Sequence, residues 1–323
     1  MVACTLIDDD LSVCDQELVI NYHLQLHTTL SVQLQTELSG EPDGPVREAL
    51  ERYLGPVFTD MAKDVDLRFY NEETDDLRYG IQEEINDSRT TYTIRLPKEN
   101  YMHLGVANMA DNARVQLSGG DHSRSMLIHP TDQDEVGAMR TGLFTARMPM
   151  SVTDSTKSFD VHLYMVNAAV ALILDTESCA DLESLDGYLT GAAYAFLIRD
   201  SIYSYGNSYR TLMESLAVSK DRLAFRGERL ADSTVPACLA TVCMPTEDEQ
   251  SWTLTVRATL TEDRHTTTTL LVPESLQAGS LRIIRCMVNS DGKIVPDEGE
   301  HAQEIGTAFE LDWGEGTEQE IEL

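Results

Sequence analysis

The sequence predicts an all-β protein that consists of two tandem β-sandwich domains, with one short helix inserted in the first. Three observations favour this fold class. Short stretches of alternating apolar and polar residues recur along the chain between turn-forming segments, as in β-sandwiches. A single stretch, residues 43–54, carries a convincing helical stripe. The chain has 323 residues, 42% of them hydrophobic, which is enough for two packed cores.

The first predicted element spans residues 16–38. Its even positions are apolar from Leu18 to Leu26 and again at Leu30, Val32, Leu34 and Leu38, whereas its odd positions are mostly polar. Period two is the pattern of a strand with one buried face and one solvated face. The stretch exceeds the usual length of a strand, so we expect a break or bend near His27–Thr29, which gives two strands or one bent strand.

A short helix is predicted next, over Asp43–Leu54. Asp43 is a suitable N-cap residue, and Pro45 is typical of the first helical turn. Gly55 and the proline after it end the pattern. Apolar residues recur between them at helical spacing, at Val46, Ala49, Leu50, Tyr53 and Leu54.

Further alternating stretches complete the first predicted domain, which covers residues 16–157. In the stretch VDLRFYN we expect Val65, Leu67 and Phe69 to point inward. A polar link over Thr153–Ser158 marks the expected boundary. The other strand patterns of this domain are TTYTIRLP, YMHLGVANM and LFTARMPMSV.

The second predicted domain covers residues 158–323. Its first pattern alternates and then continues into the apolar run Ala168–Leu174, which is typical of a strand that is buried on both faces. A hairpin is predicted where IIRCMV and KIV flank the turn Asn289–Gly292. The other strand patterns are AAYAFLIRDSIY, WTLTVRATL, TTTTLLVP, GTAFELDW and EQEIEL.

No combination of residues indicates an enzyme or a metal site. The six cysteines form no Cys-x-x-Cys pair, and Cys238 and Cys243 lie too far apart on an extended strand for a disulfide. His23 and His27 share one strand face but lie about 13 Å apart along it, too far for one metal ion. Nucleophile-elbow, phosphate-loop and dinucleotide-binding patterns do not occur. We therefore expect no catalytic residue, no cofactor and no metal ligand.

The charge of the chain excludes one class of partner. Its 55 acidic residues outnumber the 24 basic residues, which gives a net charge of -31. Such a polyanion repels nucleic-acid phosphates and anionic lipid surfaces, so we expect no nucleic-acid partner. The sequence also contains no run of about 18 apolar residues, so no transmembrane helix is predicted.

The N-terminal stretch CTLIDDDLSVC, residues 4–14, resembles the mature start of FimB-type fimbrial anchor lipoproteins. These belong to the fimbrillin superfamily of the Bacteroidetes, whose members build type V pili. Their lipidated cysteine precedes an acidic stretch, a second cysteine and the first strand. Val2-Ala3-Cys4 is similar to the end of a lipobox. The resemblance extends over most of the chain through VDLRFYNEETDD, RLPKENYMHLGVANM, VHLYMVNAAVALILDT and GTAFELDWGEGTEQEIEL.

The resemblance implies two transthyretin-like Greek-key sandwiches and a fimbrial anchor or accessory subunit at the cell surface. Residues 1–15 would be the lipobox remnant and an acidic tether, with lipid attached to Cys4. The implied partners are the outer membrane, through that lipid, and other fimbrial subunits, through β-strand addition. Relative to typical members of the family, the helix over residues 43–54 looks like an insertion.

The C-terminal stretch EQEIEL offers two interpretations. Ile321 and Leu323 alternate with acidic residues, so they are candidates for a strand that is exchanged with another subunit. The alternative is an ordinary edge strand within its own domain, which every β-sandwich requires. We favour the edge strand for this reason.

A second function stays open, namely a fimbrial tip adhesin or a surface lipoprotein that binds a host glycan or protein. Glycan-binding modules usually present exposed aromatic side chains on a flat face. Here Trp252 and Trp313 both lie in strand patterns, and aromatic residues make up only 7% of the chain. The sequence therefore favours assembly over glycan binding.

Overall fold

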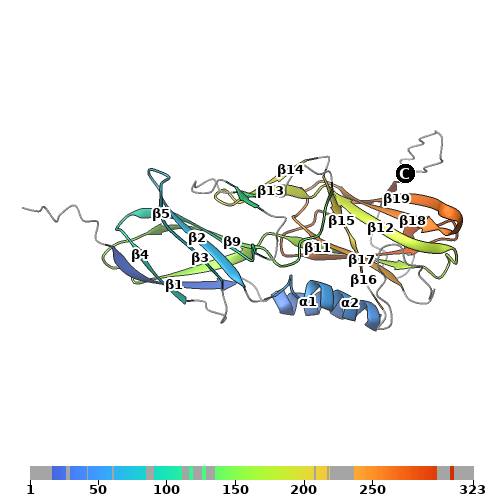
Figure 1. Ribbon diagram of the computed structural model, residues 1–323, viewed down its shortest axis with the longest axis horizontal. Helices are drawn as coiled ribbons and strands as arrows, with labels where there is room; N and C mark the ends of the chain where they lie inside the picture. The colour runs from blue at the N-terminus through green and yellow to red at the C-terminus, as the bar shows by residue number, and fades with distance from the viewer. Residues whose placement is uncertain are drawn as a thin grey trace, which may run out of the picture.

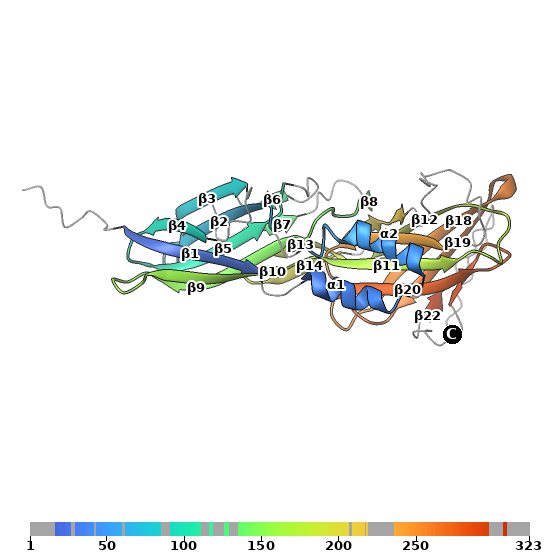
Figure 2. The same ribbon diagram turned by 90° about the horizontal axis from the view of Figure 1, so that it is seen from below.

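The computed structural model shows an elongated molecule of β-sheets with two α-helices together on one side (Figures 1 and 2). Its description covers residues 17–26, 30–41, 43–59, 62–84, 91–110, 116–118, 126–128, 135–206, 209–216, 218, 236–296 and 306–308. The all-β prediction is confirmed, since most of these residues lie in strands.

The first half of the chain forms a seven-stranded sheet in the order β3-β2-β5-β9-β10-β1-β4. This sheet folds into two layers, one with β1 and β4 and the other with β3, β2, β5 and β9. Strand β10 connects the layers, because it pairs in parallel with β1 and antiparallel with β9. The strands are β1 (Leu18–Leu26), β2 (Asp64–Asn71), β3 (Leu77–Glu84), β4 (Thr91–Leu96), β5 (Asn100–Ala107), β9 (Phe144–Ser151) and β10 (Ser158–Met165).

The two layers of this first sandwich meet in an aromatic core. Tyr22 on β1 packs edge-on against Phe69 on β2, with ring centroids 6.0 Å apart, and against Tyr92 on β4 at 6.2 Å. Val65, Leu67 and Phe69 are fully buried, as the alternation in β2 predicted. Period two therefore identified the inward face of this strand correctly.

Strand β10 lies in the first sandwich, although the sequence placed residue 158 at the start of the second domain. Its pairing with β1 and β9 means that a boundary after Lys157 would cut through the sheet. The division into two domains stays a prediction. The pairing favours a boundary at Val166–Asn167, between β10 and β11.

The second half of the chain forms most of two sheets that face each other, and β8 from the first half joins one of them. One has the order β16-β17-β11-β20-β21, and the other has the order β22-β19-β18-β12-β15-β8. The first comprises β11 (Ala168–Asp175), β16 (Glu214–Leu216), β17 (Ala237–Cys243), β20 (Leu281–Val288) and β21 (Ile294–Pro296). The second comprises β8 (Glu135–Val136), β12 (Leu182–Thr190), β15 (Arg210–Leu212), β18 (Trp252–Leu260), β19 (Arg264–Val272) and β22 (Gly306–Ala308), with the 3-10 helix η2 (Thr261–Asp263) between β18 and β19.

Strand β11 is buried on both faces, as its continuous apolar run predicted. Val170 and Leu172 belong to the core between the two sheets. Ala171 and Ile173 point to the other face and belong to a second core, which continues into the first sandwich. The predicted hairpin is also present, because β20 pairs antiparallel with β21 across the turn Asn289–Gly292.

A small four-stranded sheet connects the two halves. Its order is β14-β13-β7-β6, so strands from the first half of the chain pair with a hairpin from the second half. The turn of that hairpin also carries Arg199, which forms an ion pair with Asp75 in the β2–β3 turn. The strands are β6 (Gln116–Ser118), β7 (Met126–Ile128), β13 (Ala193–Leu197) and β14 (Ile202–Tyr205).

The predicted helix is confirmed as α2 (Gly44–Leu54). Asp43 is its N-cap, and its carboxylate accepts a hydrogen bond from the backbone N–H of Val46 at 3.1 Å. Val46, Leu50 and Leu54 are buried on one face. The N-cap, the proline in the first turn and the apolar stripe therefore predicted this helix correctly.

The prediction of a second strand between residues 30 and 38 is wrong, because this segment is the helix α1 (Leu30–Ser39). Leu30, Leu34 and Leu38 are buried, whereas Val32 is 59% exposed. A strand would have placed Val32 on the same face as the three leucines. The leucine spacing of four residues satisfies a helix as well as period two, and glutamine and leucine are good helix formers.

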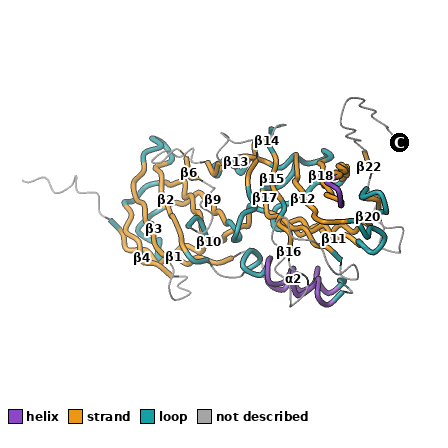
Figure 3. The backbone as a smooth tube through the Cα atoms, turned by 45° about the vertical axis from the view of Figure 1, so that its right-hand side comes forward, coloured by secondary structure: helices purple, strands orange, loops and turns teal. Residues whose placement is uncertain are grey.

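The two helices follow β1 in sequence, but they pack against the second half of the molecule. In Figures 1 and 2 they lie along β16, β17, β11 and β20, and Figure 3 shows them as one unit on that side. Glu41, between the helices, is buried and forms an ion pair with Arg285 of β20. The insertion therefore connects the first sandwich to the outer face of a sheet in the second half.

Candidate functional site

The residues that the sequence assigned to function lie outside the described part of the chain. This applies to Cys4 and the tether over residues 1–15, and also to Ile321 and Leu323. Lipid attachment and strand exchange at these residues therefore stay predictions. The described residues instead show which sheet edges could accept a strand.

The β3 edge is the outer side of β3, one end of the seven-stranded sheet. Among the described strands, β3 pairs with β2 alone. Leu77, Tyr79 and Ile81 are half-buried and pack against the core of the first sandwich. Tyr79, for example, contacts Phe69 edge-on at 5.9 Å. An edge strand whose apolar residues are only partly covered is a suitable surface for strand addition, because a new strand would bury them further.

Strand β3 was not predicted from the sequence. Its alternation of Leu77, Tyr79 and Ile81 is a usable signal, but Gly80 and the two glutamates at its end weaken the pattern. Its side chains alternate between half-buried and exposed. Edge strands of this kind carry the weakest hydrophobic signal in a β-protein.

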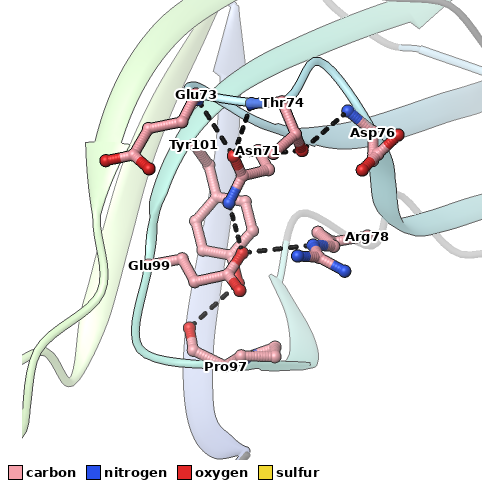
Figure 4. A network of polar contacts seen from close by, with 8 residues as sticks. All are labelled: Asn71, Glu73, Thr74, Asp76, Arg78, Pro97, Glu99 and Tyr101. Carbon is pink, nitrogen blue, oxygen red and sulfur yellow. Dashed lines mark hydrogen bonds and ion pairs between the residues drawn. The ribbon is translucent and has the colours of Figure 1, made fainter.

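A polar network holds the turn that leads from β2 into β3 (Figure 4). The side-chain oxygen of Asn71 accepts hydrogen bonds from the backbone N–H groups of Glu73 and Thr74, each at 2.9 Å. Its amide group donates to Glu99 at 2.7 Å, and Arg78 donates to the same carboxylate oxygen at 3.2 Å. Side-chain capping of this kind fixes a turn, so the start of β3 is held in place.

The same network extends to the strand after the β4–β5 turn. The hydroxyl of Tyr101 donates to the carbonyl oxygen of Pro97 at 2.9 Å, and the backbone N–H of Glu72 donates to the carbonyl oxygen of Asn100 at 2.9 Å. The network thus joins two turns at one end of the first sandwich (Figure 4). The carboxylate of Glu99 accepts hydrogen bonds from Asn71 and Arg78. These contacts indicate that Glu99 stabilises the turns.

The second candidate surface is the β19 edge, the outer side of β19 over Arg264–Thr268. The described residues of strand β22 pair with β19 at Thr269–Leu271. On the other side, β19 pairs along its whole length with β18. Within the described residues, the first five positions of β19 pair with β18 alone.

His103 is buried in the core, where it could be mistaken for a catalytic residue. Its Nδ1 lies 2.9 Å from the carbonyl oxygen of Arg68, which can only accept, so Nδ1 carries the proton. Its Nε2 therefore accepts from the hydroxyl of Tyr22 at 2.6 Å. Burial lowers the pKa of His103 to about 4, although the bond to Arg68 opposes this shift. A neutral, fully paired histidine of this kind supports the core.

Other groups that the sequence considered are also structural in the part of the chain that is described. Cys238 and Cys243 are buried free thiols, and burial raises the pKa of each to about 12. No group of three or more potential ligands among the described residues could hold a metal ion. None of the described helices is long and apolar enough to cross a membrane.

The aromatic residues do not form a flat exposed face within the described part. Trp252 is 1% exposed, and its indole N–H donates to the carbonyl oxygen of Glu274 at 2.7 Å. Tyr164 is the single strongly exposed aromatic side chain there, at 49%. Trp313 lies outside the described residues.

The sequence matches no protein-family model and no curated protein sequence. Solved structures, in contrast, share the fold. A candidate adhesin from Bacteroides thetaiotaomicron is similar with a TM-score of 0.55 and 10% identity, over 86% of this chain and 93% of that one. A candidate adhesin from Bacteroides ovatus is similar with a TM-score of 0.54 and 11% identity, over 94% and 97%.

The fimbrial anchor protein Mfa2 from Porphyromonas gingivalis also has this fold. Its TM-score is 0.51 at 10% identity, and the match covers 84% of this chain and 90% of that one. These solved structures confirm the fold that the resemblance implied. At such low identity, the likeness concerns the fold, and function needs its own argument.

Proposed function

We propose that the protein is a non-enzymatic fimbrial anchor or accessory subunit at the cell surface. The observation that carries this proposal is the fold, which matches the fimbrial anchor protein Mfa2 over most of both chains. The acidic tether sequence after Cys4 supports the same role. The net charge of -31 suits an exposed protein that stays soluble and away from anionic surfaces.

In this proposal, Cys4 carries the lipid that holds the protein at the outer membrane. A single acyl chain binds membranes weakly, so a cysteine with several chains gives a more stable attachment. Residues 5–15 would then act as a spacer between the membrane and the first sandwich. Their three consecutive aspartates, Asp8–Asp10, would keep this spacer off a negatively charged surface.

Contacts to other subunits would form by strand addition at an open sheet edge. Main-chain hydrogen bonds supply the strength of such contacts, and alternate side-chain pockets supply their register. The β3 edge suits this role because Leu77, Tyr79 and Ile81 are half-buried and because β3 pairs, among the described strands, with β2 alone. The turn network around Asn71 supports the role too, because it holds the edge in place before a partner arrives.

An adhesin is the second candidate function. The names of two similar structures favour it, since both are candidate adhesins. A glycan or protein ligand of the host would then replace the fimbrial subunit as the main partner. The burial of Trp252 argues against a glycan platform built on this residue.

Metabolic labelling tests the lipid anchor. Cells that express the full-length gene product with Cys4→Ala should incorporate no radiolabelled palmitate, whereas Cys14→Ala, as the matched control, should be labelled like the unchanged protein. Globomycin, which inhibits the lipoprotein signal peptidase, should block maturation of the labelled forms. Equal labelling with and without Cys4 would exclude the anchor, while leaving a fimbrial role through strand addition intact.

A further inference from the structure

A groove lies between α1 and α2, the two helices that cover the five-stranded sheet of the second half (Figure 2). Its volume is about 690 Å³, a size that is typical of ligand-binding sites in proteins. The residues of α1 that line it are exposed apart from Leu34, so the groove opens to solvent. Glu51 of α2, together with Gly55 and Phe58 after that helix, completes the lining.

The floor of the groove is apolar. It is formed by two buried side chains, Leu34 at 4% exposure and Phe58 at 1%. Val32, at the rim, is 59% exposed and is one of the few large apolar side chains that the described part presents to solvent. The helix α1 carries a single charged residue, Glu37, which does not line the groove. The wall that α1 contributes is therefore uncharged.

Glu51 alone is charged among the described residues that line the groove. It is half-buried, and its carboxylate forms no ion pair or hydrogen bond with any residue that the structure describes, not even with Arg47 one turn earlier. Glu41 and Glu99, in contrast, each pair with an arginine. A partner that covers the carboxylate of Glu51 removes its water, and a cation from that partner offsets the cost.

We propose that this groove binds a basic side chain, an arginine or a lysine, that a partner protein presents. Both side chains combine an aliphatic stem with a cationic end. The stem packs on Leu34, Phe58 and Val32, and the cationic end reaches Glu51. The remaining volume takes apolar side chains next to the basic residue in the same partner segment, which bury the exposed surface of Val32 further.

The charge of the chain favours a basic partner over a second copy of this protein. The net charge of -31 attracts a basic segment over long distances and raises its rate of association. A second copy carries the same net charge, so the two copies repel each other. The apolar groove with one unpaired carboxylate thus selects a basic, partly apolar segment of another protein.

The groove is formed before a partner binds. Asp43 caps α2 at its N-terminus, and the ion pair between Glu41 and Arg285 fixes the segment between the helices to β20. A partner therefore does not have to order the two helices, which lowers the cost of binding. If the partner is a fimbrial subunit, a step that rests on the proposed function, the groove is a contact site separate from the β3 edge.

Peptide titration of the full chain tests this inference. The probe is the peptide acetyl-Leu-Arg-Leu-amide, and its matched control has norleucine in place of arginine, which keeps the stem and removes the charge. Methyl NMR signals of Val32 and Leu34 report on binding in the groove. At low salt, the arginine peptide should bind about fivefold more tightly than the norleucine peptide, as a half-exposed ion pair allows. Glu51→Gln should abolish this preference. Glu48→Gln, a matched change on the exposed side of α2 outside the groove, should keep it.

Each outcome decides the question, once thermal unfolding has shown that both variants fold. Movement of both methyl signals, with an arginine preference that only Glu51→Gln removes, supports the inference. Unmoved signals up to millimolar peptide, equal binding of the two peptides, or an unchanged preference in Glu51→Gln overturns it. Signals that move with protein concentration alone overturn it too, because a second copy then occupies the groove. None of these results bears on lipid attachment or on strand addition, so the proposed function is tested separately.

Discussion

His103 shows how a single buried side chain links sequence, packing and pH. It stacks on Phe69 with ring centroids 4.3 Å apart, and both of its ring nitrogens have partners. Tyr22, which donates to it, has a pKa held well above its usual value by burial. The pair therefore stays neutral across the physiological range and acts as one packed, hydrogen-bonded unit.

The low pKa of His103 predicts a pH dependence of stability. The folded protein lowers the pKa of this group to about 4, whereas in the unfolded chain the pKa has its ordinary value of 6.5. The unfolded state thus binds more protons in between, so the stabilisation is complete above pH 6.5 and is lost as the pH falls towards 4. The loss amounts to about 3 kcal/mol. Urea unfolding measures the free energy of unfolding at pH 5 and at pH 7. The difference between these two values should be smaller for His103→Gln than for the unchanged protein. An identical difference in both proteins would contradict this pKa.

Glu41 and Arg285 form the second informative pair of residues. Glu41 is 1% exposed at its side chain and Arg285 is 24% exposed, so removal of either partner leaves the other charge in a poorly solvated place. We expect Glu41→Ala to cost about 3 kcal/mol of unfolding free energy. The double variant Glu41→Ala with Arg285→Met should lose less unfolding free energy, because neither charge then remains without its partner. A double-mutant cycle by urea unfolding measures this coupling, and additive losses would show that the pair is not coupled.

At the scale of elements, α1 shows why one prediction succeeded and its neighbour did not. The α2 segment carries a cap and a proline, signals that only a helix uses. The α1 segment contains no proline, and its leucines at 30, 34 and 38 fit both a strand and a helix. In the folded protein, the helix covers the outer face of β11 and its neighbours, and its leucines join the same core. This long-range packing favours the helix, and the local sequence does not reveal it.

The two interpretations of this segment differ at Val32. In the helix, Leu34→Ala should cost about 3 kcal/mol, since it empties a buried site. The matched change Val32→Ala should cost less than about 0.5 kcal/mol, because Val32 is exposed. Thermal or urea unfolding of the two variants gives the answer. Similar losses for both would indicate a strand, where the two side chains share a face.

The β3 edge gives a prediction about assembly. Ile81→Lys places a charge on the inner side of the edge, where an added strand would bury it, and should lower incorporation into fimbriae at least about tenfold. Gln82→Lys, on the exposed side of the same strand, is the matched control. Incorporation is measured by immunoblot of purified fimbriae, after circular dichroism has shown that both variants fold. Equal incorporation would exclude the β3 edge as a contact site.

At the scale of the whole molecule, the helices and the small sheet join the two halves. One hydrophobic core runs from Ile20 in the first sandwich to Val242 in the second half, and the helices contribute Leu38 and Leu50 to it. The sequence predicted two tandem sandwiches, and it did not predict these connections. Long-range packing of this kind depends on pairs such as Glu41 with Arg285, which lie 244 positions apart (285 minus 41) and carry no local signal.

The candidate site was predictable only in part, for related reasons. The fold class followed from period two, which is a local property of each strand. The sheet edges could not be predicted in this way, because an edge depends on which strands pair in the folded sheet and not on the pattern of one strand. Cys4 and the C-terminal stretch were found through resemblance to a family, and they lie outside the described residues.

The central claim is that this protein holds fimbriae at the cell surface. It is tested most directly by deletion of the gene in the source bacterium, followed by immunoblot measurement of fimbrial antigen on cells and in the medium. We predict that deletion moves most of the antigen into the medium and that the unchanged gene, but not Cys4→Ala, restores it to the cells. Fimbriae that stay fully cell-bound after deletion would contradict the anchoring role and leave the adhesin as the better account.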